Sequence, residues 1–176
     1  TYEMVEIPDE EQVEQFLPPF ETPNKMCFEE PKNMAFSSQP DDNTEFKYQQ
    51  NKAMMDAIEV IQQCDDDFAE TFGRAYQGMV EEIYCEDAEV VLTTLGSVTG
   101  TVRVVAEQLR AQGLKVGILK IRYMRPFPEK EIIALSKKVK AIGVIDKDIS
   151  FGYEGTIFTN VCSALAKGNA SVFKKN

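Results

Sequence analysis

Apolar side chains in the first half of the chain recur with the period of an α-helix. They stand three or four positions apart within residues 44–63 and again within residues 66–84, on either side of the run Asp65-Asp66-Asp67. Asn43 or Thr44 suits the N-cap of the first stretch, and the acidic run suits that of the second. The pattern therefore predicts two helices, and it favours a cap and solvated face over a metal site for the acidic run.

The pattern changes at residue 88, where short apolar runs begin to alternate with helical periodicity. The runs 88–94, 116–121 and 141–145 predict strands, the stretches 98–112, 128–139 and 156–166 predict helices, and another strand would start at Ala170. Continuous apolar strands separated by helices are typical of a parallel sheet that is buried on both faces and joined by right-handed crossovers. The predicted fold class is α/β, an open and mostly parallel sheet with flanking helices.

Residues 1–45 hold six of the eight prolines, which excludes long regular elements there. One short helix is predicted from Pro8 to Leu17. Four phenylalanines recur along this segment, Phe16, Phe20, Phe28 and Phe36, so we expect it to cross a surface in an extended path. The predicted organisation is an extended Pro-rich arm at 1–45, a helical linker of two helices at 46–86 and an α/β domain at 87–176. The strand-like residues at both ends lead us to expect a truncated piece of a longer chain.

The composition removes several classes of function. With 29 acidic against 19 basic residues the net charge is −10, so no basic surplus exists to bind nucleic acid or an anionic membrane. A basic protein partner is compatible with this charge. Histidine, the commonest general base near neutral pH and the commonest metal ligand, is absent.

Cysteine usage indicates free thiols. The four cysteines, Cys27, Cys64, Cys85 and Cys162, form no C-x-x-C pair, so zinc, iron–sulfur and thioredoxin-type motifs are unsupported. Without a signal peptide or a long apolar run, we expect a cytoplasmic protein.

The loop after the first predicted strand is a candidate ligand site, because ligands bind open parallel sheets at the carboxyl ends of the strands. It opens a helix, where N–H groups and hydroxyls favour an anion; its candidate cofactor-binding residues are Gly96, Ser97, Thr99, Gly100 and Thr101. It is not G-x-G-x-x-G, it lacks the lysine of a P-loop, and no acidic residue follows the second strand to hold a ribose. A helix cap with close packing is the alternative interpretation.

Two further loops carry candidate interface residues. Arg122 and Arg125 precede a Pro-Phe-Pro turn and suit an anion or carboxylate, with subunit salt bridges and a rigid turn as the alternative. The third loop, 146–155, lacks the ligand spacing of an EF-hand and indicates an ordered interaction loop or a structured turn. Its candidates are Asp146, Asp148, Ser150, Phe151 and Gly152. We predict no catalytic residue and no metal ligand in the chain.

These segments together resemble one family. Residues 88–101, AEVVLTTLGSVTGT, resemble the start of the second domain in α subunits of pyruvate:ferredoxin oxidoreductase, also called pyruvate synthase. Residues 115–122 with the R-P-F-P turn at 125–128 match that family's second strand, and residues 144–158 match its third strand and loop. Upstream, FLPP at 16–19 and FGRAY at 72–76 also fit, which adds Arg74 to the interface candidates. The resemblance covers nearly the whole chain, and the order and spacing of the motifs are specific.

The resemblance implies a transketolase C-terminal-like domain within the α subunit of a 2-oxoacid:ferredoxin oxidoreductase. The full enzyme would use thiamine diphosphate, Mg²⁺, [4Fe–4S] clusters and coenzyme A to decarboxylate pyruvate and reduce ferredoxin. This segment would hold none of these cofactors and would have an assembly role, with the other subunits (β, γ, δ or fused equivalents) as partners. The loop 146–152 is more similar to the pyruvate and branched-chain types than to the 2-oxoglutarate type.

Two alternatives remain from the sequence. A stand-alone nucleotide-binding α/β protein would use the loop 96–101 and bind a dinucleotide by itself. The second alternative is the matching domain of another thiamine-dependent enzyme. The helix around Arg74 and the segment 150–152 favour the ferredoxin-linked family over this alternative.

Overall fold

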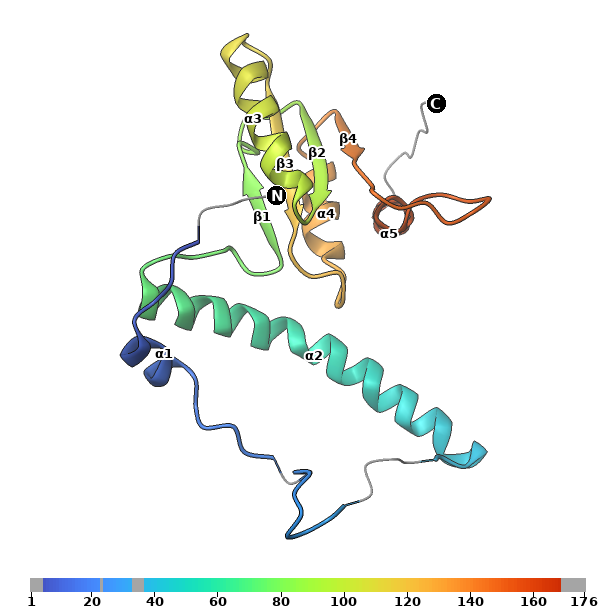
Figure 1. The fold of residues 1–176 in the computed structure, drawn as a ribbon. Coiled ribbons are helices and arrows are strands. Elements are labelled where there is room, and N and C mark those ends of the chain that lie inside the picture. The colour runs from blue at the N-terminus through green and yellow to red at the C-terminus, as the bar shows by residue number, and fades with distance from the viewer. Residues whose placement is uncertain (1–4, 23, 33–36, 169–176) are drawn as a thin grey trace. The chain divides into compact units, whose positions relative to one another are not determined.

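The computed structural model describes residues 5–22, 24–32 and 37–168, which form two compact units, Glu3–Ala75 and Tyr76 onward. The first, here called the helical unit, contains helices α1 (Glu10–Phe16) and α2 (Pro40–Phe72). The second, the α/β unit, contains strands β1 (Val80–Ile83), β2 (Val90–Leu95), β3 (Val116–Ile121) and β4 (Ala141–Val144) and helices α3 (Val98–Ala111), α4 (Glu129–Ser136) and α5 (Thr156–Lys167). Figure 1 labels all of these elements.

A single long helix dominates the helical unit. Pro40 occupies the first turn of α2, where its missing N–H is no loss, and Gly73 ends the helix in the left-handed conformation, at φ 70°. The Gly73 N–H donates to the Ala69 carbonyl at 2.9 Å. The short helix α1, predicted from Pro8 to Leu17, is confirmed. Its Phe16 ring packs edge-on against Phe68 and Phe72 of α2, with centroids 5.6 and 5.3 Å apart.

The helix predicted at 44–63 is confirmed as part of α2, whereas the prediction of a separate second helix at 66–84 is wrong. The acidic run does not cap a second helix, because Gln62 and Gln63 donate to Asp66 and Asp67 one turn later, and α2 continues through it. After Gly73 the chain makes a turn with positive φ at Gln77 and Gly78, and residues 80–83 form strand β1. Val80 and Ile83 stand three apart, a spacing that places two side chains on one face of a helix, so the local pattern favoured a helix over the observed strand.

The α/β unit is built on a four-stranded sheet in the order β1-β3-β2-β4. Strand β2 pairs in parallel with β3 and with β4, while β1 is an antiparallel edge strand on β3. The predicted open, mostly parallel α/β sheet is therefore confirmed, and the antiparallel edge strand was not predicted. The additional strand predicted from Ala170 lies outside the described residues.

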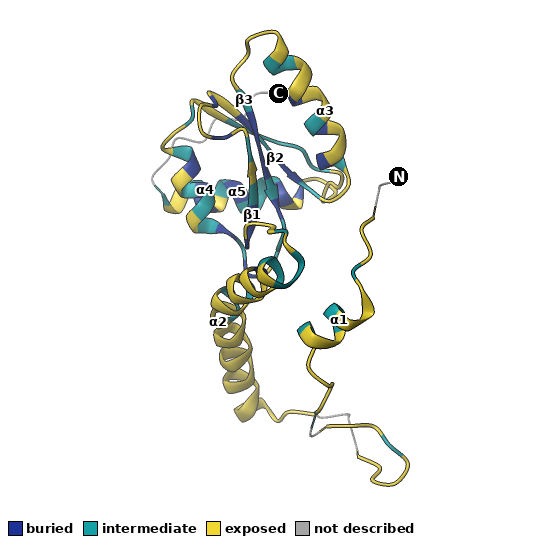
Figure 2. Ribbon diagram, turned by 90° about the vertical axis from the view of Figure 1, so that its left-hand side faces the viewer, coloured by how far each residue is buried: buried dark blue, intermediate teal, exposed yellow. Residues whose placement is uncertain are grey.

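Helices cover both faces of this sheet. The chain moves from β2 to β3 on one side and then back past β2 to β4, so right-handed crossovers place α3 and α4 on opposite faces. Figure 2 shows α3 on one side of the sheet and α4 with α5 on the other. Neighbouring residues Ile118 and Leu119 of β3 point to opposite faces and are both fully buried, as a sheet covered on both sides requires.

Candidate functional site

The carboxyl ends of β2, β3 and β4 lie at the same end of the sheet. In register, Leu95 is opposite Ile121 and Thr93 is opposite Val144, so the three loops that follow these strands leave the sheet together. This arrangement brings together the three loops that the sequence marked as candidates. In an open α/β sheet, ligands bind at the carboxyl ends of the strands.

The loop after β2 is fastened from both sides. Gly96 has φ 73°, a conformation that strongly favours glycine, and its carbonyl accepts the Thr99 N–H at 3.1 Å. The buried hydroxyls of Thr94 and Thr99 are hydrogen-bonded at 2.9 Å. From the neighbouring loop, Lys147 Nζ donates to Ser97 Oγ at 2.8 Å. Two candidate hydroxyls of this loop are thus already engaged with protein groups, Ser97 at the surface and Thr99 in the interior.

Asp146 connects the end of β4 to the start of α5. Its Oδ2 accepts the Phe158 N–H at 2.9 Å, which satisfies one of the unpaired donors in the first turn of that helix. A Cβ at Gly155 would come within 2.2 Å of the same oxygen, so only glycine fits there without rearrangement. Next to it, Asp148 Oδ2 accepts the Thr156 hydroxyl at 2.8 Å. Both carboxylates therefore fasten the loop 146–155 to the N-terminus of α5.

The two carboxylates differ in acidity. Burial raises the pKa of Asp146, against the lowering effect of the Phe158 N–H, and the neighbouring Asp148 carboxylate raises it further. The Thr156 hydroxyl lowers the pKa of Asp148. Asp146 Oδ1 is buried and has no hydrogen-bond partner, which agrees with a carboxyl whose ionised form is poorly compensated.

A pocket of about 260 Å³ lies between these loops. Its lining comes from the ends of all three parallel strands and the start of α5: Leu95, Met124, Ile145, Asp146, Lys147, Asp148, Thr156 and Ile157. Most of these positions were not singled out from the sequence. Lys147 pairs with a residue 50 positions earlier, and the apolar ones resemble any core position, so no local signal marks them.

The arginines after β3 have different surroundings. Arg122 Nη1 donates to the carbonyls of Tyr76 and Gly78 at 2.9 and 2.7 Å, and its guanidinium lies 5.1 Å from the Tyr76 ring centroid. It holds the turn that leads into β1. Arg125 is exposed, and its Nη1 donates to the adjacent Met124 carbonyl. The anion-binding role of either arginine stays a prediction.

The remaining candidates lie at the surface. Residues 150–154 form a tight turn, in which the Tyr153 N–H donates to the Ser150 carbonyl at 2.7 Å and Gly152 has φ 79°. Phe151 at its tip is fully exposed. These features are compatible with both interpretations of the loop, a structured turn and an interaction loop.

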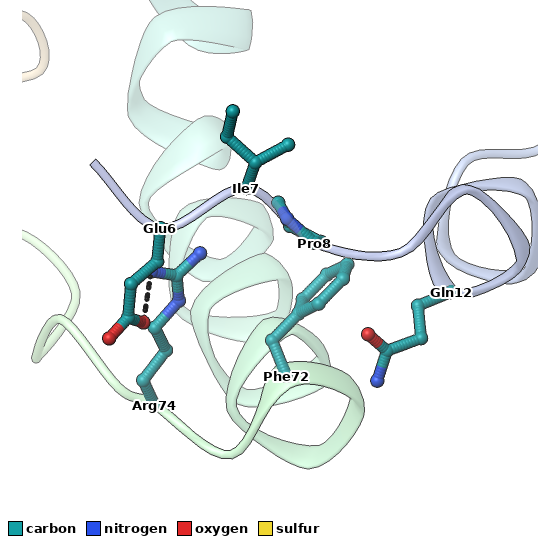
Figure 3. A pocket seen from close by; sticks show the side chains of 6 residues that line it. All are labelled: Glu6, Ile7, Pro8, Gln12, Phe72 and Arg74. Carbon is teal, nitrogen blue, oxygen red and sulfur yellow. Dashed lines mark hydrogen bonds and ion pairs between the residues drawn. The ribbon is translucent and has the colours of Figure 1, made fainter.

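In the helical unit, Arg74 lines a pocket of about 350 Å³ together with Glu6, Ile7, Pro8, Gln12 and Phe72. Figure 3 shows Arg74 and Glu6 pointing toward each other; Arg74 Nη1 donates to Glu6 Oε2 at 2.8 Å. The Arg74 guanidinium also lies 5.4 Å from the Phe68 ring centroid. Arg74 therefore ties the extended arm to the C-terminal end of α2.

Neither a cluster of metal ligands nor a membrane-spanning helix is found in the described part of the chain. Among them, no group of three or more Cys, Asp or Glu side chains is placed to hold a metal. None of the described helices is long and apolar enough to cross a bilayer.

The fold, with three loops at the carboxyl ends of its parallel strands, defines an open, mostly parallel α/β module that is preceded by a helical unit. Comparison with known proteins makes the assignment specific. The profile of the family described as pyruvate:ferredoxin oxidoreductase core domain II matches residues 88–175. The chain therefore belongs to the pyruvate:ferredoxin oxidoreductase family, as its sequence motifs predicted.

Curated relatives match beyond the α/β unit. Ketoisovalerate oxidoreductase subunit VorA of Pyrococcus abyssi is 40% identical over 177 residues, covering 100% of this chain and 45% of that protein. Pyruvate synthase subunit PorA of Methanothermobacter thermautotrophicus is 39% identical over 165 residues, covering 94% of this chain and 43% of that protein. PorA of Methanosarcina barkeri is 37% identical over 172 residues. The chain thus spans less than half the length of these relatives.

Proposed function

We propose that the chain is part of the α subunit of a 2-oxoacid:ferredoxin oxidoreductase, which oxidatively decarboxylates pyruvate to acetyl-CoA and reduces ferredoxin. The observation that carries this proposal is the identity of 40% along the whole chain, arm and α2 included. A shared α/β fold alone would explain sequence similarity only within the α/β unit, not in the arm and α2. Relatives named for pyruvate and for ketoisovalerate are about equally similar, so a branched-chain 2-oxoacid is the second candidate substrate.

Within that enzyme we assign the segment an assembly role. The four cysteines do not fit an iron–sulfur cluster: Cys85 is buried, its thiol donates to the Ile118 carbonyl at 3.2 Å, and burial raises its pKa, which opposes the thiolate that a cluster needs. Burial also raises the pKa of the Cys162 thiol. The described residues likewise offer no acidic cluster for the Mg²⁺ of thiamine diphosphate. These cofactors and coenzyme A would bind other parts of a cytoplasmic complex.

Ligand-dependent melting of the purified chain tests this assignment. We expect no change in Tm with NAD, NADP, FMN, coenzyme A or thiamine diphosphate with Mg²⁺. A ligand present at a hundred times its Kd would add about 2.7 kcal/mol, a shift of several degrees. A dinucleotide shift that is abolished by a bulky replacement of Gly96 or Gly100 would contradict the assembly role and favour a stand-alone nucleotide-binding protein. A shift with thiamine diphosphate would place the cofactor on this segment.

Reconstitution tests the activity. The chain, the remainder of its subunit and the other subunits are combined, and coenzyme A-dependent reduction of ferredoxin is measured with pyruvate and with ketoisovalerate. We expect activity only when this chain is present, and the ratio of kcat/KM for the two acids identifies the substrate. Equal activity in a complex that lacks the chain would refute the proposal.

A further inference from the structure

The loop between β4 and α5 carries the most exposed apolar side chains of the α/β unit. Ile149, Phe151 and Tyr153 stand at alternate positions and have exposed fractions of 64%, 100% and 67%. Among the described residues of this unit, no other large apolar side chain is as exposed. Figure 1 shows the connection between β4 and α5 projecting outward from the sheet. Exposed apolar groups that gather at one place on a unit with a buried core are typical of a protein contact.

The loop holds these side chains in a defined conformation. The Tyr153 N–H donates to the Ser150 carbonyl at 2.7 Å, and Gly152 supplies the positive φ, 79°, that the turn between them needs. Phe151 stands at the tip of this turn. At the base of the loop, the carboxylates that follow β4 fasten it to the N-terminus of α5. A loop that is ordered before binding loses little conformational entropy on binding, so its exposed aromatic ring is suited to anchor an interface.

The length of the relatives indicates what covers this tip. The chain spans less than half of the VorA and PorA subunits that it matches. As part of such a subunit, the α/β unit would be tethered to the remainder of the same polypeptide. Covalent linkage gives that remainder a high effective concentration beside the loop, higher than that of a separate protein in solution. The remainder of the subunit is therefore the occupant that we assign to the tip.

A second copy of the chain fits this tip less well. The pocket at the carboxyl ends of the strands would offer a concave surface for a reciprocal exchange of loops, but Asp146 and Asp148 line it. The Thr156 hydroxyl lowers the pKa of Asp148, which is therefore ionised at neutral pH. The loop that would enter the pocket carries the same Asp148, three positions before Phe151. Two copies would bring like charges together, and an anionic lipid surface would be repelled by the same carboxylate.

We propose that Phe151, with Ile149 and Tyr153 beside it, is an anchor that inserts into an apolar pocket on the remainder of the same α subunit. The proposal rests on the proposed function, which supplies that remainder, and it adds which loop makes the contact. Ser150 and Gly152 form the turn that presents the ring. An aromatic side chain that fills a pocket at the centre of an interface contributes a large share of the binding energy.

Photocrosslinking in the assembled enzyme identifies the occupant. The α subunit is produced as one uncut polypeptide with p-benzoylphenylalanine in place of Phe151, and the matched control has it in place of Leu114. Leu114 is 51% exposed and precedes β3, at the opposite end of the sheet. After irradiation, denaturing gels show whether the product has the mass of one subunit or of two, and mass spectrometry of peptides identifies the crosslinked segment.

We expect a crosslink from position 151 at the mass of one subunit, to a segment outside residues 1–176, and no such crosslink from position 114. A crosslink from position 151 to another subunit, to a second copy or to residues 3–75 of its own chain would overturn the choice of occupant. Equal crosslinking from both positions, or none from position 151, would overturn the docking surface while an active complex leaves the proposed function intact. Failure of the unmodified subunits to form an active complex would overturn both proposals.

A substitution separates docking from folding. Phe151→Ser should leave the Tm of the 176-residue chain unchanged, because the side chain is fully exposed and contacts little to lose. It should raise at least about tenfold the concentration of this chain that gives half-maximal activity with the remainder of the subunit and the other subunits, whereas Leu114→Ser should change it less than about twofold. A lower Tm of the Phe151→Ser chain would indicate a structural role for the ring, and equal effects of the two variants on assembly would overturn the anchor.

Discussion

At the scale of single residues, Asp146 has a structural task that its sequence position does not reveal. It accepts the Phe158 N–H and so caps α5 from the end of β4. Replacing it by alanine removes this acceptor, and we expect a loss of about 1 kcal/mol in the free energy of unfolding. Asparagine keeps an acceptor oxygen, so Asp146→Asn should retain most of the stability. Urea denaturation at neutral pH distinguishes the two variants, and equal losses would contradict the capping role.

The pH dependence of Asp146→Asn gives a second prediction with a definite sign. Burial raises the pKa of Asp146 in the folded chain, so its contribution to stability falls as pH rises from the unfolded value, 3.8, through the raised folded one. Asparagine does not ionise, and the stability of the variant relative to the parent should therefore increase from about pH 4 to about pH 7.

Asp87→Asn is the matched control for that measurement. The Arg110 hydrogen bond lowers the pKa of Asp87, so this carboxylate contributes stability above its unfolded pKa and loses it as pH falls through the folded one. The relative stability of this variant should therefore decrease as pH rises toward the unfolded value, 3.8, and stay nearly constant from about pH 4 to about pH 7. Parallel pH profiles for the two variants would contradict the assigned causes.

Gly155 depends on the same carboxylate. Its φ of −67° is open to any residue, so the cost of Gly155→Ala comes only from the contact of the new Cβ with Asp146 Oδ2 and Cγ, at 2.2 and 2.5 Å. We expect a loss of about 1–3 kcal/mol, typical of overpacking. In an Asp146→Gly background the same substitution should be nearly neutral. A double-mutant cycle measures this coupling, and purely additive effects would contradict the steric cause.

At the scale of elements, the edge strand β1 is held by a side chain from the end of β3. Arg122 bridges the carbonyls of Tyr76 and Gly78 across the turn that enters β1. We expect Arg122→Met to cost about 1.5–3 kcal/mol in the free energy of unfolding, the range for hydrogen bonds to a charged group. Arg125→Met is the control, because Arg125 is exposed and its guanidinium donates to the carbonyl of Met124, its neighbour in sequence. This substitution should change the free energy of unfolding by less than about 0.5 kcal/mol. Equal losses would show that Arg122 does not hold β1.

The elements also show which parts of the fold are predictable from sequence. Strand β3 was predicted with its observed bounds, because Val116 to Ile121 is an apolar run bounded by turn signals and buried on both faces. Strand β1 was predicted as helix, because its pairing with β3 is decided by residues about 40 positions away. The parallel topology was sufficient to predict that the loops after β2, β3 and β4 lie together. The Lys147–Ser97 and Asp146–Phe158 contacts were not predictable, because each depends on the packed positions of separate elements.

At the scale of the whole molecule, the two units differ in what holds them together. The α/β unit contains every described hydrophobic residue that is buried, including Ile118, Ile132 and Val161 from a strand and two helices. The helical unit contains one long helix, a short one and an extended arm. A unit with a core unfolds cooperatively, whereas a long helix without one derives little stability from its own residues.

Separate expression of the two units tests this difference. A fragment of residues 76–176 should give a single, steep urea transition and dispersed amide signals in NMR spectra. A fragment of residues 3–75 should show partial helical circular dichroism that is lost gradually, over a broad range of urea. A steep transition in the second fragment would show that the helical unit is stable alone and would remove the need for a partner to order it. If the helical circular dichroism of residues 3–75 is lost gradually in the isolated fragment but in one steep urea transition when the other subunits are added, assembly supplies the missing contacts.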